Sequence, residues 1–143
     1  MTTRDRSRAR RWISSVVFAW GLALGFLTQA DALTEQRVEV TIKDFTFVVK
    51  QVPLQLNTPI LISIRNEDQV RHDFGSPVFD GNPTQVESEG VISYGRGVGG
   101  VFLNPSRDAM IRFTIGRPGR YEFKCSIHPN MKGELLLLNV EAV

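Results

Sequence analysis

The side chains in this chain that could do chemistry are its only cysteine and its two histidines. Cys125 stands in the stretch CSIHPNM, where His128 follows at the third position and Met131 at the sixth. His72 lies far upstream in the stretch RHDF. Thiolate, imidazole and thioether groups are all ligands of transition metals. We therefore expect one metal site if the fold brings His72 to the Cys125 loop.

This donor set favours copper. A soft thiolate suits Cu(I), and two histidines with one cysteine and a weak axial methionine define a blue-copper electron-transfer site. Such a site lies between the geometries preferred by the two oxidation states, so it reorganises little when an electron moves. Pro129 fixes the chain after His128, and Gly133 lets the chain turn into the last strand. The pattern predicts a single copper ion bound by His72, Cys125, His128 and Met131.

Each of these residues also has a simpler interpretation when taken alone. A lone cysteine on an apolar strand is more often a small buried hydrophobe than a ligand. A histidine beside an aspartate is often a hydrogen-bonded surface residue, and a methionine near a strand end usually fills the core. The metal hypothesis rests on the combination, because both histidines and the only cysteine fall where one site would use them.

The segments that must position these residues are predicted to be β-strands, because hydrophobic and polar residues alternate along them. The predicted strands are 37–43, 45–49, 60–65, 111–115, 121–125 and 134–143. Turn-forming residues separate them at 57–59, 104–108 and 117–119. The segment 75–100 reads as a long loop with one short strand at 91–94. Short strands spaced by turns predict an all-β fold, a sandwich or a small barrel.

Two motifs, HDF at 72–74 and FKCSIHPNMKG at 123–133, resemble the ligand motifs of the cupredoxins. These are the small blue copper proteins of the amicyanin and plastocyanin type. The resemblance covers residues 37–143 and implies a Greek-key β-sandwich with copper near one end, held by the four ligands named above. Family members often have asparagine directly after the first histidine, where it braces the cysteine loop. Here that residue is Asp73, a departure that bears on the reduction potential.

The first 32 residues have the pattern of a secretory signal peptide. Arginines are followed by an uncharged apolar run at 12–28 and by the sequence ADA, which ends at Ala32. We expect residues 1–32 to be this signal peptide and 33–143 to be the exported, periplasmic domain. The alternative is an uncleaved anchor that holds the domain on the periplasmic face of the membrane, although the run is slightly short for a span.

The charge distribution argues against nucleic-acid binding. The arginine-rich start accounts for the basic excess, and the remainder of the chain is nearly balanced and has no basic stripe with interleaved aromatics. The single cysteine cannot form a disulfide within its own chain, so a metal ligand is one of the uses left to it.

We expect an exported monomer that carries single electrons between protein redox partners. The alternative is a periplasmic copper delivery or sensing protein that uses the same ligands. We expect no enzyme, because a catalytic copper needs further histidines and a dinuclear centre needs a second cysteine. A metal-free binding sandwich stays open at this point, and zinc also suits thiolate and imidazole.

Overall fold

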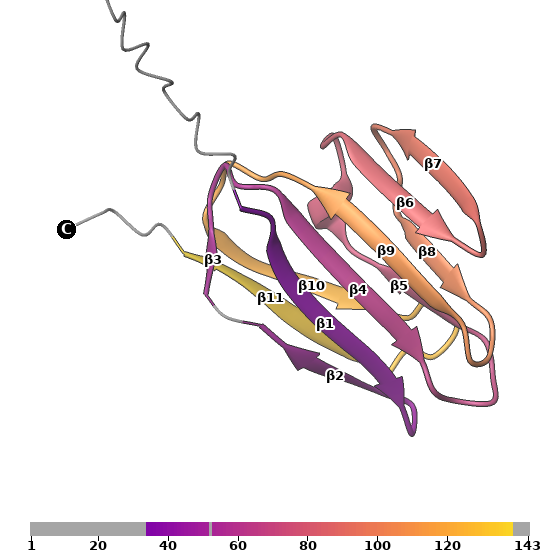
Figure 1. The fold of residues 1–143 in the computed structure, drawn as a ribbon. Helices are drawn as coiled ribbons and strands as arrows, with labels where there is room; N and C mark the ends of the chain where they lie inside the picture. Colours follow the sequence, from indigo (N-terminus) through magenta and orange to yellow (C-terminus); the bar gives the residue numbers. More distant parts are fainter. Residues whose placement is uncertain (1–33, 52, 139–143) are drawn as a thin grey trace, which may run out of the picture. The chain divides into compact units, whose positions relative to one another are not determined.

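The computed structural model describes residues 34–51 and 53–138, which form two β-sheets stacked as a sandwich (Figure 1). The first sheet contains, in spatial order, β2 (Thr46–Lys50), β1 (Gln36–Lys43), β4 (Ile60–Asn66), β9 (Asp108–Phe113), β6 (Thr84–Ser88) and β7 (Val91–Gly95). The second contains β3 (Leu54–Gln55), β11 (Lys132–Leu138), β10 (Gly119–Lys124), β5 (His72–Gly75) and β8 (Gly100–Leu103). Strand β1 runs parallel to β4, and β3 runs parallel to β11.

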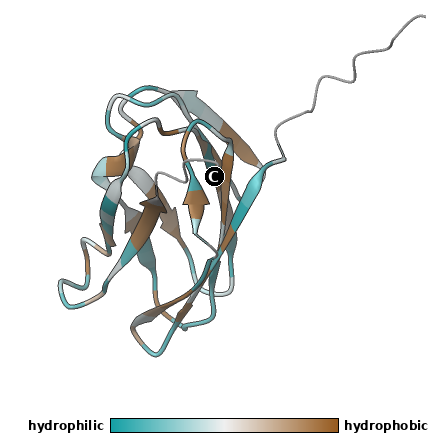
Figure 2. Ribbon diagram, turned by 90° about the vertical axis from the view of Figure 1, so that its left-hand side faces the viewer, coloured by the Kyte–Doolittle hydropathy of each residue, from teal (hydrophilic) through white to brown (hydrophobic). Residues whose placement is uncertain are grey.

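The alternating residues of the predicted strands point into the space between the two sheets. In β1 the buried residues are Val38, Val40 and Ile42. In β4 the buried hydrophobic residues are Ile60, Ile62 and Ile64, together with Leu61. Hydrophobic residues gather on the strands, whereas much of the connecting chain is hydrophilic (Figure 2). Burial of this apolar surface is the main force that holds the sheets together.

Three phenylalanines connect the two sheets beneath the end that carries the histidines. Phe47 of β2 packs edge-on against Phe74 of β5 and Phe123 of β10, with ring centroids 5.8 Å and 5.2 Å away. Phe74 and Phe123 lie 4.6 Å apart. Full burial of one such side chain contributes about 1.5–3 kcal/mol. The cluster therefore anchors β5 and β10, the strands that lead into and out of the candidate site.

The segment 75–100 is more regular than the sequence predicted. It contains the short 3₁₀ helix η1 (Pro77–Phe79) and a hairpin of β6 and β7, of which only the strand near 91–94 was expected. Glu89 and Gly90 both have positive φ, as a two-residue hairpin turn requires. The prediction of a loop was wrong because β6 is largely polar, and its pairing with β9 stabilises it through the sheet.

Some predicted strand boundaries also need correction. Phe45 was placed in a strand, but it lies in the turn between β1 and β2 with a φ of 57°. The strand expected at 111–115 begins earlier, at Asp108, because its first residues pair with the end of β4. Neither change moves a buried residue to the other face of its sheet.

The predicted all-β Greek-key sandwich is confirmed as the fold class. The expected signal peptide at 1–32 lies outside the described residues. Within residues 34–51 and 53–138, no helix is long and apolar enough to cross a membrane.

Candidate metal centre

The structure brings His72, Cys125 and His128 together at one end of the sandwich. His72 is the first residue of β5, and Cys125 directly follows β10, its antiparallel neighbour in the sheet. His128 lies in the loop between β10 and β11, as does Met131. The close approach of β5 and β10 therefore joins two parts of the sequence that are far apart.

The distances between the ligand atoms fit a single metal ion. The sulfur of Cys125 lies 3.5 Å from Nδ1 of His128 and 3.9 Å from Nδ1 of His72. All three ligand atoms lie within 4.8 Å of one another. Bond lengths to zinc are roughly 2.3 Å for sulfur and 2.0–2.1 Å for nitrogen. With these lengths, a sulfur–metal–nitrogen angle of about 120° places sulfur and nitrogen about 3.8 Å apart. The observed spacing is therefore one that a metal ion could span with little movement.

The site is buried on one side and partly open on the other. His72, Cys125 and Met131 are almost completely inaccessible to solvent, whereas His128 is half-buried. A buried thiol and imidazole lose their contacts with water, and a bound metal would replace those contacts. The imidazole of His128 is the part of the donor set nearest the surface.

Backbone hydrogen bonds fold the loop that carries Cys125, His128 and Met131. The N–H of Cys125 donates to the carbonyl oxygen of Met131 at 3.1 Å, and the N–H of Met131 donates to that of His128 at 2.9 Å. Gly133 has a different role from the predicted one. A Cβ at this position would lie 2.5 Å from Cζ of Phe123, so glycine is needed for close packing against that ring and not for a turn.

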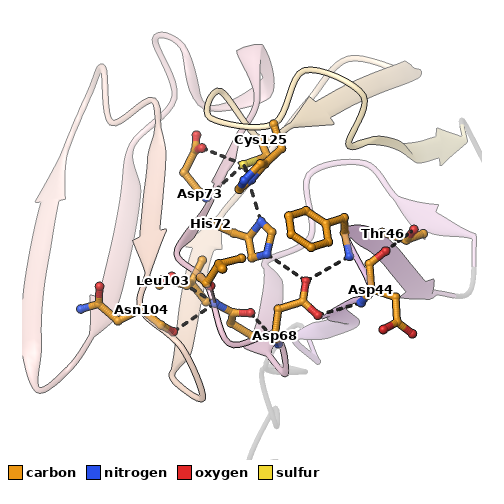
Figure 3. A network of polar contacts seen from close by, with 12 residues as sticks. Asp44, Thr46, Asp68, His72, Asp73, Leu103, Asn104 and Cys125 are labelled. Carbon is orange, nitrogen blue, oxygen red and sulfur yellow. Dashed lines mark hydrogen bonds and ion pairs between the residues drawn. The ribbon is translucent and has the colours of Figure 1, made fainter.

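Asp73 braces the same loop from β5. Its Oδ1 accepts hydrogen bonds from the backbone N–H of Ser126 at 2.7 Å and from the Ser126 hydroxyl at 3.1 Å. It also accepts from the Cys125 thiol at 3.1 Å (Figure 3). The backbone N–H of Asp73 donates to the Cys125 sulfur at 3.4 Å. The aspartate therefore supports the cysteine loop, and it adds a carboxylate beside the sulfur.

Asp68 contacts His72 on the side of the imidazole ring opposite Cys125, a role that the sequence analysis missed. Oδ2 of Asp68 lies 2.9 Å from Nε2 of His72 (Figure 3). Burial alone would raise the pKa of the Asp68 carboxyl. The hydrogen bonds from the backbone N–H groups of Phe45 and Asp44, together with His72, hold that pKa below its usual value. An ionised carboxylate can only accept hydrogen bonds, so a neutral His72 bonded to it would carry its proton on Nε2 and keep the lone pair of Nδ1.

The loop that carries Asp68 is fastened by Asn66, a fully buried residue at the end of β4. The side-chain amide of Asn66 donates to the carbonyl oxygens of Val70, Leu103 and Asn104 at 2.9–3.2 Å. Its Oδ1 accepts from the N–H of Asp68 at 3.0 Å. These hydrogen bonds of Asn66 fix the start of the loop that leads to His72.

Phe45 also belongs to the site and was missed as well. Its ring lies edge-on to both imidazoles, 5.5 Å from His72 and 5.0 Å from His128 between ring centroids. It is 52% exposed, so it forms part of the outer surface over the histidines. The stretch KDFT between two apolar runs was a usable turn signal, but nothing in it pointed to a distant histidine.

A family model described as a cupredoxin-like domain matches residues 16–137 of this chain. Among solved structures, a reduced variant of amicyanin is 16% identical over 70% of this chain and 80% of its own, with a TM-score of 0.43. An oxidised amicyanin variant is 13% identical over 78% and 88%, with a TM-score of 0.47. A multicopper oxidase from Campylobacter jejuni is 13% identical over 72% of this chain and 29% of its own, with a TM-score of 0.49. A comparison with curated protein sequences finds no match.

The chain belongs to the cupredoxin-like family, as the sequence motifs indicated. Copper is the metal that cupredoxins bind, and the cluster of His72, Cys125 and His128 fits a copper ion in both its donor atoms and its spacing. The expected cofactor is therefore supported by both the family and the site.

Proposed function

We propose that this protein is a mononuclear blue copper protein that carries single electrons between protein partners. The observation that carries the proposal is the convergence of one sulfur and two imidazole nitrogens from distant segments within 4.8 Å. His72, Cys125 and His128 would be the principal ligands. When bound, copper would supply a one-electron couple between Cu(I) and Cu(II).

Met131 would be the weak axial ligand. It is 2% exposed, and its backbone forms hydrogen bonds with the backbones of Cys125 and His128. A thioether in this position would adjust the potential and contribute little to the affinity. Its assignment depends on the spacing of the loop and on the burial of its side chain.

The chain's own contribution to electron transfer is to hold the ligands still. The backbone hydrogen bonds of the Cys125 loop, the carboxylate of Asp73 and the anchoring of β5 and β10 restrict movement at the site. A rigid donor set lowers the cost of reorganisation when the charge changes. The half-buried His128 would be the route by which an electron reaches a docked partner.

We propose further that the domain acts outside the cytoplasm. The motivation is the leader pattern at 1–32, with cleavage after Ala32 leaving a domain of residues 33–143. An uncleaved leader would instead hold the domain on the periplasmic face of a membrane. Mass spectrometry of the N-terminus of protein recovered from a periplasmic extract would distinguish the two forms.

A copper delivery or sensing protein is the second candidate, since it would use the same ligands. Voltammetry together with a chelator challenge separates the two functions. An electron carrier is expected to show a reversible one-electron wave and to keep its copper in both oxidation states. Release of copper to a mild chelator on reduction, without a reversible wave, would contradict the carrier function and support delivery.

A further inference from the structure

The turn between β1 and β2 has an unfavourable backbone for its sequence. Asp44 and Phe45 are consecutive residues with φ values of 51° and 57°. A two-residue hairpin turn with both residues in the left-handed region usually contains asparagine or aspartate followed by glycine. Phenylalanine in the second position is disfavoured by its Cβ. Strained residues of this kind persist where surrounding contacts hold them, and they cluster at functional sites.

Asp68 makes the contacts that hold this turn. Its Oδ1 accepts from the N–H of Asp44 at 2.7 Å, and its Oδ2 accepts from the N–H of Phe45 at 3.0 Å. The two oxygens of one carboxylate therefore satisfy both N–H groups of the strained turn. The side chain of Asp68 is only 10% exposed, which strengthens these bonds relative to bonds in water.

The same carboxylate orients His72. Oδ2 of Asp68, already bonded to Phe45, also lies 2.9 Å from Nε2 of His72. Figure 3 shows this carboxylate between the turn and the imidazole, with the cysteine sulfur on the opposite side of the ring. A carboxylate that accepts from Nε2 fixes the tautomer of a histidine and leaves the other ring nitrogen available to a metal.

We propose that Asp68 is a positioning residue that couples the strained Phe45 turn to the tautomer of His72. Through this coupling, Nδ1 of His72 faces Cys125 without a proton before metal binds, and the Phe45 ring covers both imidazoles. The inference rests on the proposed function, in which His72 is a copper ligand. It adds that the geometry of His72 is already set in the metal-free protein, and that this geometry depends on Asp68, which is not itself a ligand.

The test is the Asp68→Asn variant of the full chain, studied without metal. An amide has one acceptor oxygen and cannot replace both carboxylate oxygens. Its NH₂ group can instead donate to Nε2, which would favour the tautomer with the proton on Nδ1. We expect ¹⁵N NMR of His72 at a pH of about 8, where a typical histidine is neutral, to show a single tautomer in the wild type and a changed tautomer in the variant.

The matched control is Glu67→Gln. It removes the same charge from the neighbouring residue, whose carboxylate forms an exposed ion pair with Lys43 at 3.9 Å. We expect this control to keep the wild-type tautomer. We expect the Cu(II) affinity to fall by about 10- to 100-fold in Asp68→Asn and to stay unchanged in Glu67→Gln. Asp68→Glu should recover part of the loss, because it restores both acceptor oxygens.

A second variant separates loss of folding from loss of positioning. Glycine adopts positive φ without strain, so Phe45→Gly combined with Asp68→Asn should fold even if Asp68→Asn alone does not. A folded double variant with the wild-type His72 tautomer would overturn the coupling. The tautomer is read in the metal-free protein, so it tests Asp68 independently of copper. If the wild type bound no copper, the proposed function alone would fail.

Discussion

The Oδ1 atom of Asp73 lies 3.1 Å from the sulfur of Cys125 and accepts a hydrogen bond from its thiol. If a bound metal replaced that proton, the side chain of Asp73 would lie beside a thiolate. The atom also accepts from the backbone N–H of Ser126, which is the bracing that an asparagine could provide equally well. The difference between Asp73 and asparagine is therefore chiefly one of charge next to the metal site.

We predict that Asp73→Asn raises the reduction potential of the copper-loaded protein. A negative charge beside the sulfur favours the more highly charged Cu(II) state, and its removal weakens that preference. Contacts that involve a charged group are worth about 1.5–3 kcal/mol, and a one-electron couple shifts by about 59 mV for each tenfold change, so we expect a rise of roughly 60–130 mV. Voltammetry measures this shift.

Asp80→Asn is the matched control for this prediction. Asp80 is an exposed carboxylate near Asp73, and both line a shallow pocket beside β5. Its removal should leave the potential nearly unchanged. Equal potentials for Asp73→Asn and the wild type would contradict an influence of the Asp73 charge on the metal.

Met131→Leu is predicted to keep copper and to raise its potential. Leucine fills a similar volume, so the cost in folding free energy should stay below about 1.5 kcal/mol. Loss of the thioether removes a donor that stabilises Cu(II), and the axial ligand tunes the potential of such sites. Met110→Leu, a change on β9 outside the ligand loop, is the control. If the two variants had the same potential, Met131 would not be an axial ligand.

Gly133→Ala should destabilise the domain. The added Cβ would lie 2.5 Å from Cζ of the buried Phe123, and this ring is packed against Phe47 and Phe74. Overpacking of this kind typically costs about 1–3 kcal/mol, measurable by denaturant unfolding of the metal-free protein. Gly95→Ala is the control, because a Cβ there would meet no atom within 4 Å. If Gly133→Ala and Gly95→Ala had the same free energy of unfolding, the Phe123 ring would be able to move aside freely.

Cys125→Ser is predicted to abolish intense visible absorption in the copper-loaded protein. The hydroxyl of serine can still donate to Asp73, so the loop should keep its shape, which circular dichroism would check. The absorption of a blue site arises from charge transfer between thiolate and copper, and serine has no thiolate. A strong band that survived in this variant would refute ligation by Cys125.

Much of the fold followed from the sequence because its strands alternate strictly. Val38, Val40 and Ile42 of β1 are buried as expected, because a half-buried strand must place alternate residues on one face. The hairpin of β6 and β7 was not predicted, because β6 alternates weakly and depends on its partners in the sheet. The alternation of hydrophobic and polar residues within a segment cannot predict a strand that is stabilised mainly by pairing with its neighbours.

The candidate site was predictable to the extent that its residue types are rare. With one cysteine and two histidines in the chain, few other combinations existed. Asp68 and Phe45 were missed because aspartate and phenylalanine are common, and their importance comes from contacts across the fold. Asp68 contacts His72 within one loop, but its bonds to Asp44 and Phe45 reach a turn that precedes it by more than twenty residues. Such contacts become visible only when the strands are in place.

The most direct test of the central claim is the visible spectrum of the purified protein during titration with Cu(II). We predict one bound copper per chain and an intense band that disappears on reduction and returns on oxidation. A folded protein with a reduced Cys125 that stayed colourless after one equivalent of Cu(II) would contradict the blue-copper assignment. The cluster of His72, Cys125 and His128 would then have to serve another metal or none.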